Sequence, residues 1–479
     1  MPTREQPLRI PWWYARLGAL ALELRVPVSA TRAFDWHERV GAFERLSPPW
    51  QRIRVVERSG GIRDGARVTL DLGFPVGRWR LEHFDYRAGL AFHDRQLAGP
   101  FARYEHAHEF RDQDGIGILS DRLSYALPFA PLSAPGEAII GARFERLFAW
   151  RHRVTRADLL HIAHRTTPPL TIGVTGAGGF IGGELCAFLS TQGHRVVRFE
   201  RGEGHARAGD VIRWQPSRGV LDPAALQGLD AIVHLAGAGI ADAPWTPARK
   251  HELVESRVRS TKTLAQAMAA ALPNGGPRVL VSTSAIGIYG DRGDEKLTEA
   301  SPPGKGFLAG LATEWERAAD PARAAGVRVV HPRIGIVLWP QSGALAKLAP
   351  PFQFGAGGPL GDGKAWWSWI SAHDLLDALL WAVEDGRATG AFNAVSPRPV
   401  RQRELARTLG RVLSRPSFAP TPAFALRMLL GREQADELLL GSQHVLPWML
   451  EAAGFAWRDP ELEPALAAMF GRPRLKSMA

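Results

Sequence analysis

The chain has 479 residues, of which 45% are hydrophobic and 22% are charged. This ordinary globular composition excludes a fibrous or wholly disordered protein, and the length predicts more than one domain. Cys186 is the single cysteine, which excludes a disulfide framework and a multi-cysteine metal site. A net charge of +11 would suit nucleic acid as a partner, but the arginines are dispersed among acidic residues without a basic run. We therefore expect an arginine-biased surface and no nucleic-acid partner.

No stretch of about 18 residues is apolar enough to predict a membrane span. The start of the chain carries charged residues and a short apolar run, Leu17 to Leu22, without a small-residue cleavage site. We therefore expect no membrane span and a cytoplasmic protein. The sequence pattern indicates no oligomeric state.

Residues 1–165 are expected to form an α+β domain. A strand is expected over Leu22–Ala30, followed by helical structure from Thr31, a candidate N-cap, to Leu46, in two short helices. The strand candidates that follow lie at residues 52–58, 66–72, 78–86, 90–97, 103–110 and 116–126. A long helix over residues 137–164 then has an apolar face formed by Ile140, Phe144, Leu147 and Val154. This order predicts a curved sheet around a terminal helix, a shape that encloses a cavity.

This order of elements resembles the START-like helix-grip family, which includes polyketide cyclases and lipid-carrying proteins. The motifs that carry the resemblance are Phe34–Arg39, Ser47–Trp50, Gly99–Phe101, and His106 with His108. The resemblance implies that the cavity of this domain binds an apolar small molecule.

Several histidines of this domain fall on neighbouring strand candidates. His106 and His108 are two residues apart, so on a strand they share a face, and His83 and His93 lie on adjacent strands. Imidazole is a common metal ligand. Because no carboxylate joins these histidines at a recognisable ligand spacing, hydrogen-bonded histidines are the favoured interpretation, and no metal is expected.

The organisation changes at Arg165–Pro169, where two prolines interrupt the pattern. Beyond this point strands alternate with helices, which predicts a doubly wound parallel sheet of the Rossmann type. We expect this nucleotide-binding domain to span residues 170–400. Residues 401–479 are expected to be helical and to complete a small substrate lobe.

A glycine-rich turn follows the first strand of this second part. Residues 170–175 read as a buried strand, and a helix follows to about residue 192. In a dinucleotide-binding fold the first glycine allows a tight turn, the second lets the backbone approach the pyrophosphate, and the third lets helix and strand pack closely. The helix N-terminus faces the anion. The cofactor-binding residues expected here are Gly176, Gly179, Phe180, Ile181 and Gly182.

The spacing of these glycines resembles the fingerprint of the extended short-chain dehydrogenases/reductases. Leu235, Ala236 and Gly237 match the cofactor-facing residues that follow the fourth strand of that family. Further segments resemble an epimerase-like group that carries a special C-terminal segment, namely Pro244–Thr246, Glu255–Arg257, Phe307–Ala309, Trp315–Glu316, Phe352–Gly361, Ser368–Ile370, Arg427–Gly431 and Leu439–Gln443. The resemblance implies an NAD(P)-dependent oxidoreductase or epimerase-like protein.

Two neighbouring residues bear on the choice of cofactor. Glu200 stands 18 residues after Gly182, where an acid would hydrogen-bond the ribose hydroxyl of NAD. Arg201 follows, where the family resemblance places an arginine that accommodates the 2′-phosphate of NADP. We favour NADP, with NAD as the alternative.

The acid–base pair that the resemblance implies is missing. Short-chain dehydrogenases use Tyr-x-x-x-Lys with a serine, but here Phe307 and Leu311 occupy the tyrosine and lysine positions. Ser284 remains as the catalytic candidate, either bonding a substrate carbonyl or satisfying backbone groups at a strand end. Lys305 and Glu316 flank the missing pair, and surface solvation is favoured for both. An enzyme is the first hypothesis; the second is a non-catalytic NADP(H) sensor or scaffold.

Overall fold

A computed structural model describes residues 18–51, 53–129, 132–202 and 207–472, so the expectation about the start of the chain lies outside the described residues. Internal contacts divide the chain into two units, Met1–Thr166 and Thr167–Ala479.

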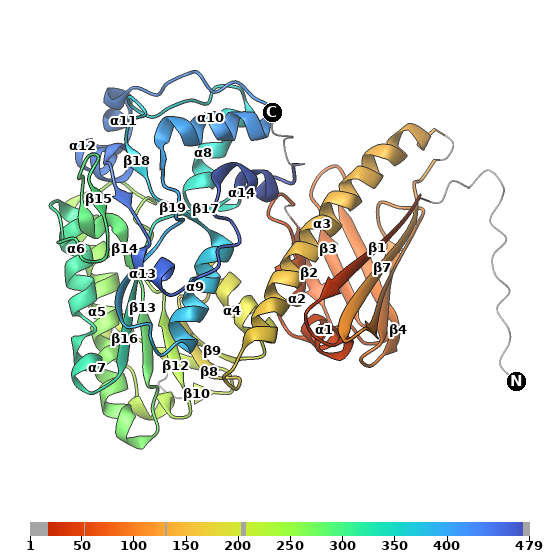
Figure 1. Ribbon diagram of the computed structural model, residues 1–479, viewed down its shortest axis with the longest axis horizontal. Helices are drawn as coiled ribbons and strands as arrows, with labels where there is room; N and C mark the ends of the chain where they lie inside the picture. The colour runs from red at the N-terminus through yellow and green to blue at the C-terminus, as the bar shows by residue number, and fades with distance from the viewer. Residues whose placement is uncertain (1–17, 52, 130–131, 203–206, 473–479) are drawn as a thin grey trace, which may run out of the picture. The chain divides into compact units, whose positions relative to one another are not determined.

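The first unit is a seven-stranded antiparallel sheet that curves around one long helix (Figure 1). Its strands run in the order β1-β7-β6-β5-β4-β3-β2, so only β1 leaves chain order. The strands are β1 (Gly18–Val26), β2 (Arg54–Arg58), β3 (Arg67–Asp71), β4 (Arg78–Arg87), β5 (Ala91–Ala98), β6 (Arg103–Gln113) and β7 (Ile116–Ala126). The predicted strands from residue 52 onward are all present, with ends shifted by a few residues.

The beginning of this unit differs from the expectation. Strand β1 ends at Val26, because Pro27 has no N–H to donate to the sheet. The next segment forms the two short helices expected there, α1 (Ala30–Glu38) and α2 (Ala42–Leu46). Gly41, with a φ of 98°, separates them in a conformation that favours glycine. The N-cap of α1 is Ser29, whose side chain accepts the backbone N–H of Arg32, and not Thr31.

Helix α3 (Ala134–His164) supplies the apolar face that closes the concave side of the sheet. Phe144 and Phe148 are buried against Tyr104 and Leu123 of the sheet. Further along the helix, Leu159 packs with the residues of α1 and β7. The helix-grip architecture predicted for this unit is confirmed.

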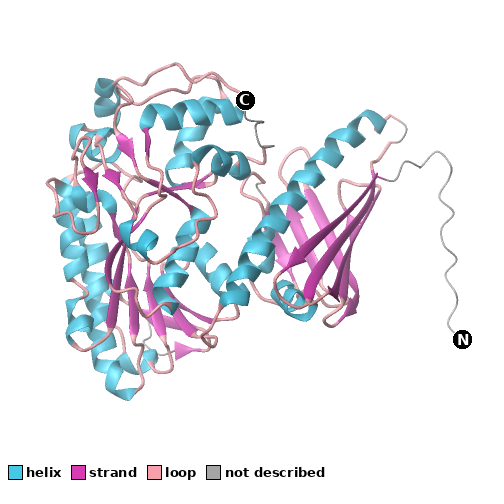
Figure 2. Cartoon of the chain, in the orientation of Figure 1, coloured by secondary structure: helices cyan, strands magenta, loops and turns pink. Residues whose placement is uncertain are grey.

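The second unit is built on a mostly parallel sheet with helices on both faces (Figure 2). Its strands run in the order β10-β11-β9-β8-β12-β13-β16-β14, and β20 pairs with β16. The main strands are β8 (Thr171–Thr175), β9 (Arg195–Arg201), β10 (Arg207–Ala208), β11 (Val211–Trp214), β12 (Ala231–His234), β13 (Val279–Ser282), β14 (Ser284–Ala285), β16 (Arg328–Ile334) and β20 (Gly390–Ala394). The Rossmann-type fold class predicted from the sequence is confirmed.

Each face of this sheet has its own core, because neighbouring residues of a strand point to opposite sides. Helices α4 (Phe180–Thr191) and α9 (Ala372–Glu384) cover one face, where Phe188 and Leu379 pack on Val174. Helices α5 (Pro247–Ala271) and α7 (Asp320–Ala324) contribute to the other, where Met268 packs with Ile232.

The C-terminal segment joins a third apolar cluster at the end of this unit. The helices of the C-terminal segment are α10 (Gln402–Leu413), α11 (Ala423–Leu430), α12 (Arg432–Ala435), α13 (Trp448–Ala452) and α14 (Leu462–Met469). Two further helices of the unit precede this segment, α6 (Phe307–Arg317) and α8 (Gly343–Gln353). The short strands are β15 (Lys296–Leu297), β17 (Ile336–Trp339), β18 (Trp366–Trp367), β19 (Trp369–Ser371), β21 (Val400–Arg401) and β22 (His444–Val445). Trp367 and Trp369 are buried in this cluster, whereas Trp366 is half-buried and stacks on His444.

Candidate functional site

The turn between β8 and α4 has the geometry that a phosphate-binding loop requires. Gly176 has a φ of 68°, and a Cβ placed on it would lie 2.9 Å from the backbone carbon of Leu235. A Cβ on Gly182 would lie 2.2 Å from the backbone oxygen of Gly176, so the helix packs on the turn only because residue 182 is glycine. Both glycines are therefore required by the backbone itself.

The N-terminus of α4 is suited to binding an anion. Gly179 is its N-cap and offers no side-chain cap, and the first turn contains no acidic residue. The first backbone N–H groups of an α-helix have no partner within the helix and carry a partial positive charge. Phe180, Ile181 and Gly182 contribute these groups, and the described residues fit a pyrophosphate at this position.

The loop after β12 is tied to the strand that precedes the glycine turn. Thr175 accepts the backbone N–H groups of Leu235 and Ala236 at 3.1 and 3.3 Å, and its Oγ1 lies 2.7 Å from His234 Nδ1. His234 is fully buried, and burial lowers its pKa to about 3. The imidazole is therefore neutral at neutral pH. Gly237 is close-packed as well, since a Cβ there would lie 3.1 Å from the guanidinium carbon of Arg257.

The end of β9 presents two charged residues on opposite faces of the sheet. Both Glu200 and Arg201 are exposed, and the strand extends through Arg201 rather than ending at Glu200. Arg213 of β11 is the cross-strand neighbour of Glu200, and its guanidinium lies over Gly202. Arg213 is not recognisable as a neighbour from the sequence, because only the pairing of β9 with β11 brings it to this edge.

The positions of the missing acid–base pair lie at the start of α6. Phe307 is the first residue of this helix, and its ring packs against Trp245 with 5.0 Å between ring centroids. Leu311 is one turn further and lines a cavity of about 200 Å³. Glu437 caps the helix by accepting the backbone N–H groups of Phe307 and Leu308 at 2.9 and 2.8 Å.

Ser284 is bonded to a buried ion pair. Its hydroxyl donates to Glu316 at 2.8 Å, and Arg333 binds both oxygens of the same carboxylate at 2.9 and 3.0 Å. Burial would raise the pKa of Glu316, but hydrogen bonds and the charge of Arg333 outweigh it and lower this pKa. The expectation that Glu316 is surface-solvated is therefore wrong; Lys305 is exposed as expected. The hydroxyl of Ser284 therefore has a side-chain carboxylate as its partner, a contact that the sequence did not indicate.

Two neighbouring cavities lie beside α6. Among the described residues that line the 200 Å³ cavity, Arg257 and Glu437 have ionisable side chains. Burial lowers the pKa of Arg257 to about 10, and its guanidinium lies 5.2 Å from the ring centre of Trp315. A cavity of about 550 Å³ shares Glu437 with the first and adds the basic Arg292 and Lys305 and the acidic Asp291 and Asp436. Together they form a cleft with apolar walls and a rim of mixed charge.

The first unit contains an apolar cavity of about 430 Å³ with a polar cluster at its wall. Asp94, His106 and His108 line it, and Asp121 contacts both histidines. Burial disfavours a charged His106, but hydrogen bonds to Asp121 and Asp94 raise its pKa to about 9. Burial and the charge of His106 lower the pKa of His108 to about 3. The spacing of these histidines along the chain indicated no carboxylate partner, but strand pairing brings Asp94 and Asp121 to them.

Comparisons with known proteins cover most of the chain. Residues 172–394 match the NAD dependent epimerase/dehydratase family, residues 421–469 a domain of unknown function, and residues 26–152 the polyketide cyclase/dehydrase and lipid transport family. An epimerase family protein of Mycobacterium bovis is 38% identical over 302 residues, which are 63% of this chain and 98% of that protein.

The chain belongs to the epimerase family.

Two solved structures of this family resemble the chain. The nucleoside-diphosphate sugar epimerase from Corynebacterium glutamicum is 31% identical, with a TM-score of 0.77, and the match covers 96% of this chain and 91% of that one. The human epimerase family protein SDR39U1, solved with NADPH, is 31% identical, with a TM-score of 0.57, over 63% of this chain and 99% of that one. Among the described residues no helix is long and apolar enough to cross a membrane.

Proposed function

We propose that this epimerase-family protein is an NADP(H)-dependent oxidoreductase that works without the Tyr-x-x-x-Lys pair. The observation that carries the proposal is the uncapped N-terminus of α4 behind a turn that only glycine permits at Gly176 and Gly182. This arrangement suits the pyrophosphate of a dinucleotide. The human relative solved with NADPH supports the same cofactor for this chain.

Basic residues at the edge of β9 support NADP over NAD. Arg201 ends the strand, and the guanidinium of Arg213 lies over Gly202, one residue further. A guanidinium binds a phosphate through charge-assisted hydrogen bonds. Glu200 lies on the other face of the strand from Arg201 and is the cross-strand neighbour of Arg213, where its charge opposes binding of a 2′-phosphate.

The cleft beside α6 is our candidate for the substrate. Bound NADP(H) supplies or accepts a hydride, and a proton must then be exchanged with the substrate oxygen. The 200 Å³ cavity offers the carboxylate of Glu437 for this exchange, or a water held between Glu437 and Arg257. Ser284 and Glu316 are committed to each other and to Arg333, so we assign them to holding the strand ends in place.

A deuterium-transfer experiment tests the proposal. The purified protein is incubated with NADPH deuterated at either face of C4 and with an extract of small metabolites, and products are analysed by mass spectrometry. Deuterium in a product, from one face only and absent in Gly179→Val, supports the oxidoreductase. The Glu437→Gln variant then shows whether this carboxylate takes part in the proton exchange.

A second function, NADP(H) sensing without catalysis, is favoured by one observation. Phe307 and Leu311 cannot exchange protons, and Phe307 is packed on Trp245. Tight NADPH binding without deuterium transfer to any metabolite would establish this function instead.

The cavity of the first unit is our candidate for an apolar ligand with a polar end. Apolar side chains such as Leu70, Leu81 and Phe144 line most of it. Arg151 also lines it, and its buried Nε has no hydrogen-bond partner among the described residues. Mass spectrometry of the protein purified under native conditions tests whether an acidic lipid-like molecule is bound.

A further inference from the structure

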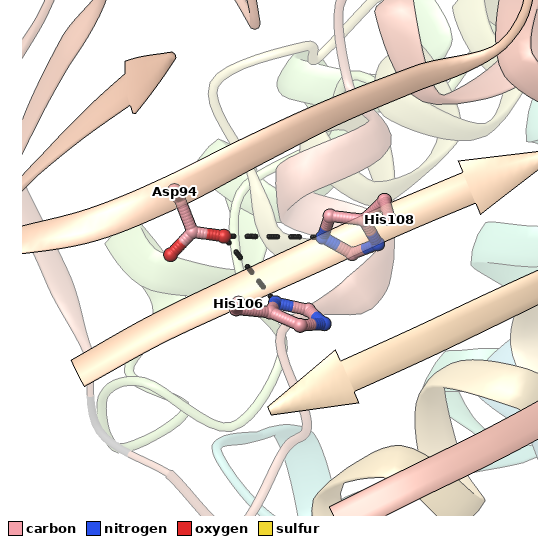
Figure 3. A group of neighbouring side chains, drawn as sticks. All are labelled: Asp94, His106 and His108. Carbon is pink, nitrogen blue, oxygen red and sulfur yellow. Dashed lines mark ion pairs between the residues drawn. The ribbon is translucent and has the colours of Figure 1, made fainter. Parts of the chain in front are cut away.

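Three side chains from two adjacent strands converge at the wall of the 430 Å³ cavity (Figure 3). Asp94 lies on β5, and His106 and His108 lie on the same face of β6. Asp94 Oδ2 is 3.3 Å from His106 Nδ1 and 3.9 Å from His108 Nε2. One oxygen and one nitrogen from each histidine lie within 4.8 Å of one another, and all three residues are buried.

The other nitrogen of each histidine faces a second carboxylate. Asp121 Oδ1 lies 3.1 Å from His106 Nε2 and 2.7 Å from His108 Nδ1. Metal-binding histidines characteristically donate their remaining N–H to a carboxylate, which fixes the tautomer and the direction of the ring. Here Asp121 forms a hydrogen bond with His106 Nε2 and lies beside His108 Nδ1, and His106 Nδ1 and His108 Nε2 are turned toward Asp94.

His152 of α3 holds Asp121 in turn. Its Nε2 lies 2.6 Å from Asp121 Oδ2. Only 4% of the surface of Asp121 is exposed. A carboxylate buried to this extent is stable in its charged form only with partners such as the histidines around it. The arrangement thus has an inner set of three residues and an outer carboxylate that is itself anchored.

We propose that Asp94, His106 and His108 bind a divalent zinc ion, with the remaining coordination position open to the cavity. Two imidazoles and one carboxylate are a ligand set that zinc accepts in sites that keep an open position. Tetrahedral coordination at the usual zinc–ligand lengths separates ligand atoms by about 3.4 Å, so the Asp94–His106 distance already fits and the Asp94–His108 distance must close by about 0.5 Å.

The open coordination position faces the cavity, so the lining of the cavity determines which kind of molecule can be the fourth ligand. Because the surrounding cavity is lined mostly by apolar side chains, the fourth ligand is water or the oxygen-bearing end of an apolar molecule. The inference concerns the first unit and does not depend on dinucleotide binding by the second.

The test uses the full chain without a histidine tag. The protein is dialysed against a chelator, loaded with Zn²⁺, desalted, and measured by elemental mass spectrometry and titration calorimetry. We expect one tightly held Zn²⁺ per chain. Co²⁺ in its place should give the visible absorption bands of a tetrahedral N/O site.

Variants locate the ion. Asp94→Asn and His108→Gln should each reduce Zn²⁺ affinity by more than the 10- to 100-fold expected for His152→Gln, which removes only an outer partner. His83→Gln is the matched control, since His83 lines the same cavity and pairs with Asp94 across β4 and β5, yet is not among the converging ligands. It should bind Zn²⁺ as the parent does. Circular dichroism and thermal unfolding, equal in all variants, show that each remains folded.

Three outcomes would overturn the proposal. The folded parent does not bind Zn²⁺; Asp94→Asn and His108→Gln bind it as the parent does; or His83→Gln loses it equally. The first outcome would identify the cluster as a buried network of hydrogen bonds between histidines and carboxylates. The other two would place the ion elsewhere.

Discussion

Thr175 Oγ1 lies 2.7 Å from His234 Nδ1, and the two residues end neighbouring strands, β8 and β12. The same hydroxyl accepts the backbone N–H of Leu235. The strand that leads into the glycine turn is therefore locked to the loop that carries Leu235–Gly237. Both backbone segments expected to face the cofactor are positioned by one buried hydroxyl and one neutral imidazole.

Acidification should weaken this arrangement through His234. Its pKa falls from 6.5 to about 3 on folding, so below pH 6.5 the unfolded chain takes up a proton that the folded chain refuses. Stability from this group is thus complete above pH 6.5 and is lost as the pH falls toward 3. Between pH 6.5 and 3, the free energy of unfolding of His234→Gln should decrease with falling pH less steeply than that of the parent, by about 1.4 kcal/mol per pH unit. Urea unfolding of parent and variant at pH 7.5, 6 and 5 measures the difference; identical slopes would contradict it.

Gly179→Val should abolish dinucleotide binding with a modest loss of stability. A Cβ at residue 179 lies 3.3 Å from the oxygen of Gly176, a contact that a small shift relieves, while the side chain obstructs the anion. Gly182→Ala is the contrast, because its Cβ would lie 2.2 Å from that oxygen and should destabilise the fold. NADPH titration by fluorescence and thermal unfolding separate the two effects. Unchanged NADPH affinity in Gly179→Val would mean that the phosphate binds elsewhere.

Arg201→Ala should weaken NADPH binding and leave NADH binding nearly unchanged. A charge-assisted hydrogen bond is worth roughly 1.5–3 kcal/mol, which corresponds to about ten- to a hundredfold in affinity. Glu200→Ala should tighten NADPH and loosen NADH. Arg195→Ala is the control, since Arg195 begins the same strand and pairs with Asp210.

The dissociation constants for both cofactors are measured at one salt concentration, because screening alters charge pairs. Equal weakening of NADPH and NADH by Arg201→Ala would show that this arginine supports the fold. A parent that prefers NADH, with the preference lost in Glu200→Ala, would make Glu200 the ribose ligand.

Glu316→Ala should destabilise the second unit far more than Ser284→Ala. Removing the carboxylate leaves the guanidinium of Arg333 buried without its counter-charge, which costs about 3–5 kcal/mol. Removing the Ser284 hydroxyl deletes one hydrogen bond to a charged group, worth roughly 1.5–3 kcal/mol. Urea unfolding checks the order. Retained stability in Ser284→Ala together with lost deuterium transfer would instead return Ser284 to a catalytic role.

Residues 167–479 should fold and bind NADPH without the first unit. Internal contacts separate the chain at Thr166, and every element around the glycine turn belongs to the second unit. The fragment is expressed alone, and its NADPH affinity and circular dichroism are compared with those of the full chain. An unfolded fragment beside a binding full-length protein would show that the two units depend on each other.

Local patterns in the sequence were sufficient for both folds and for the glycine turn. The glycine spacing from Gly176 to Gly182 depends on neighbours within a few residues, where backbone geometry alone decides the structure. The two short helices expected at the start of the chain are present, but the N-cap was placed at Thr31 instead of Ser29, because both residue types are capable caps.

The chemistry of both candidate sites was decided by tertiary contacts. Glu316 meets Arg333 from 17 residues away, and Asp94 reaches His106 only because β5 and β6 are paired in that register. The sequence by itself determined which residue types were present and which local elements they form. Burial of charges and the pairing of distant side chains arise only when the strands assemble, since register and packing bring together groups whose spacing along the chain carries no signal.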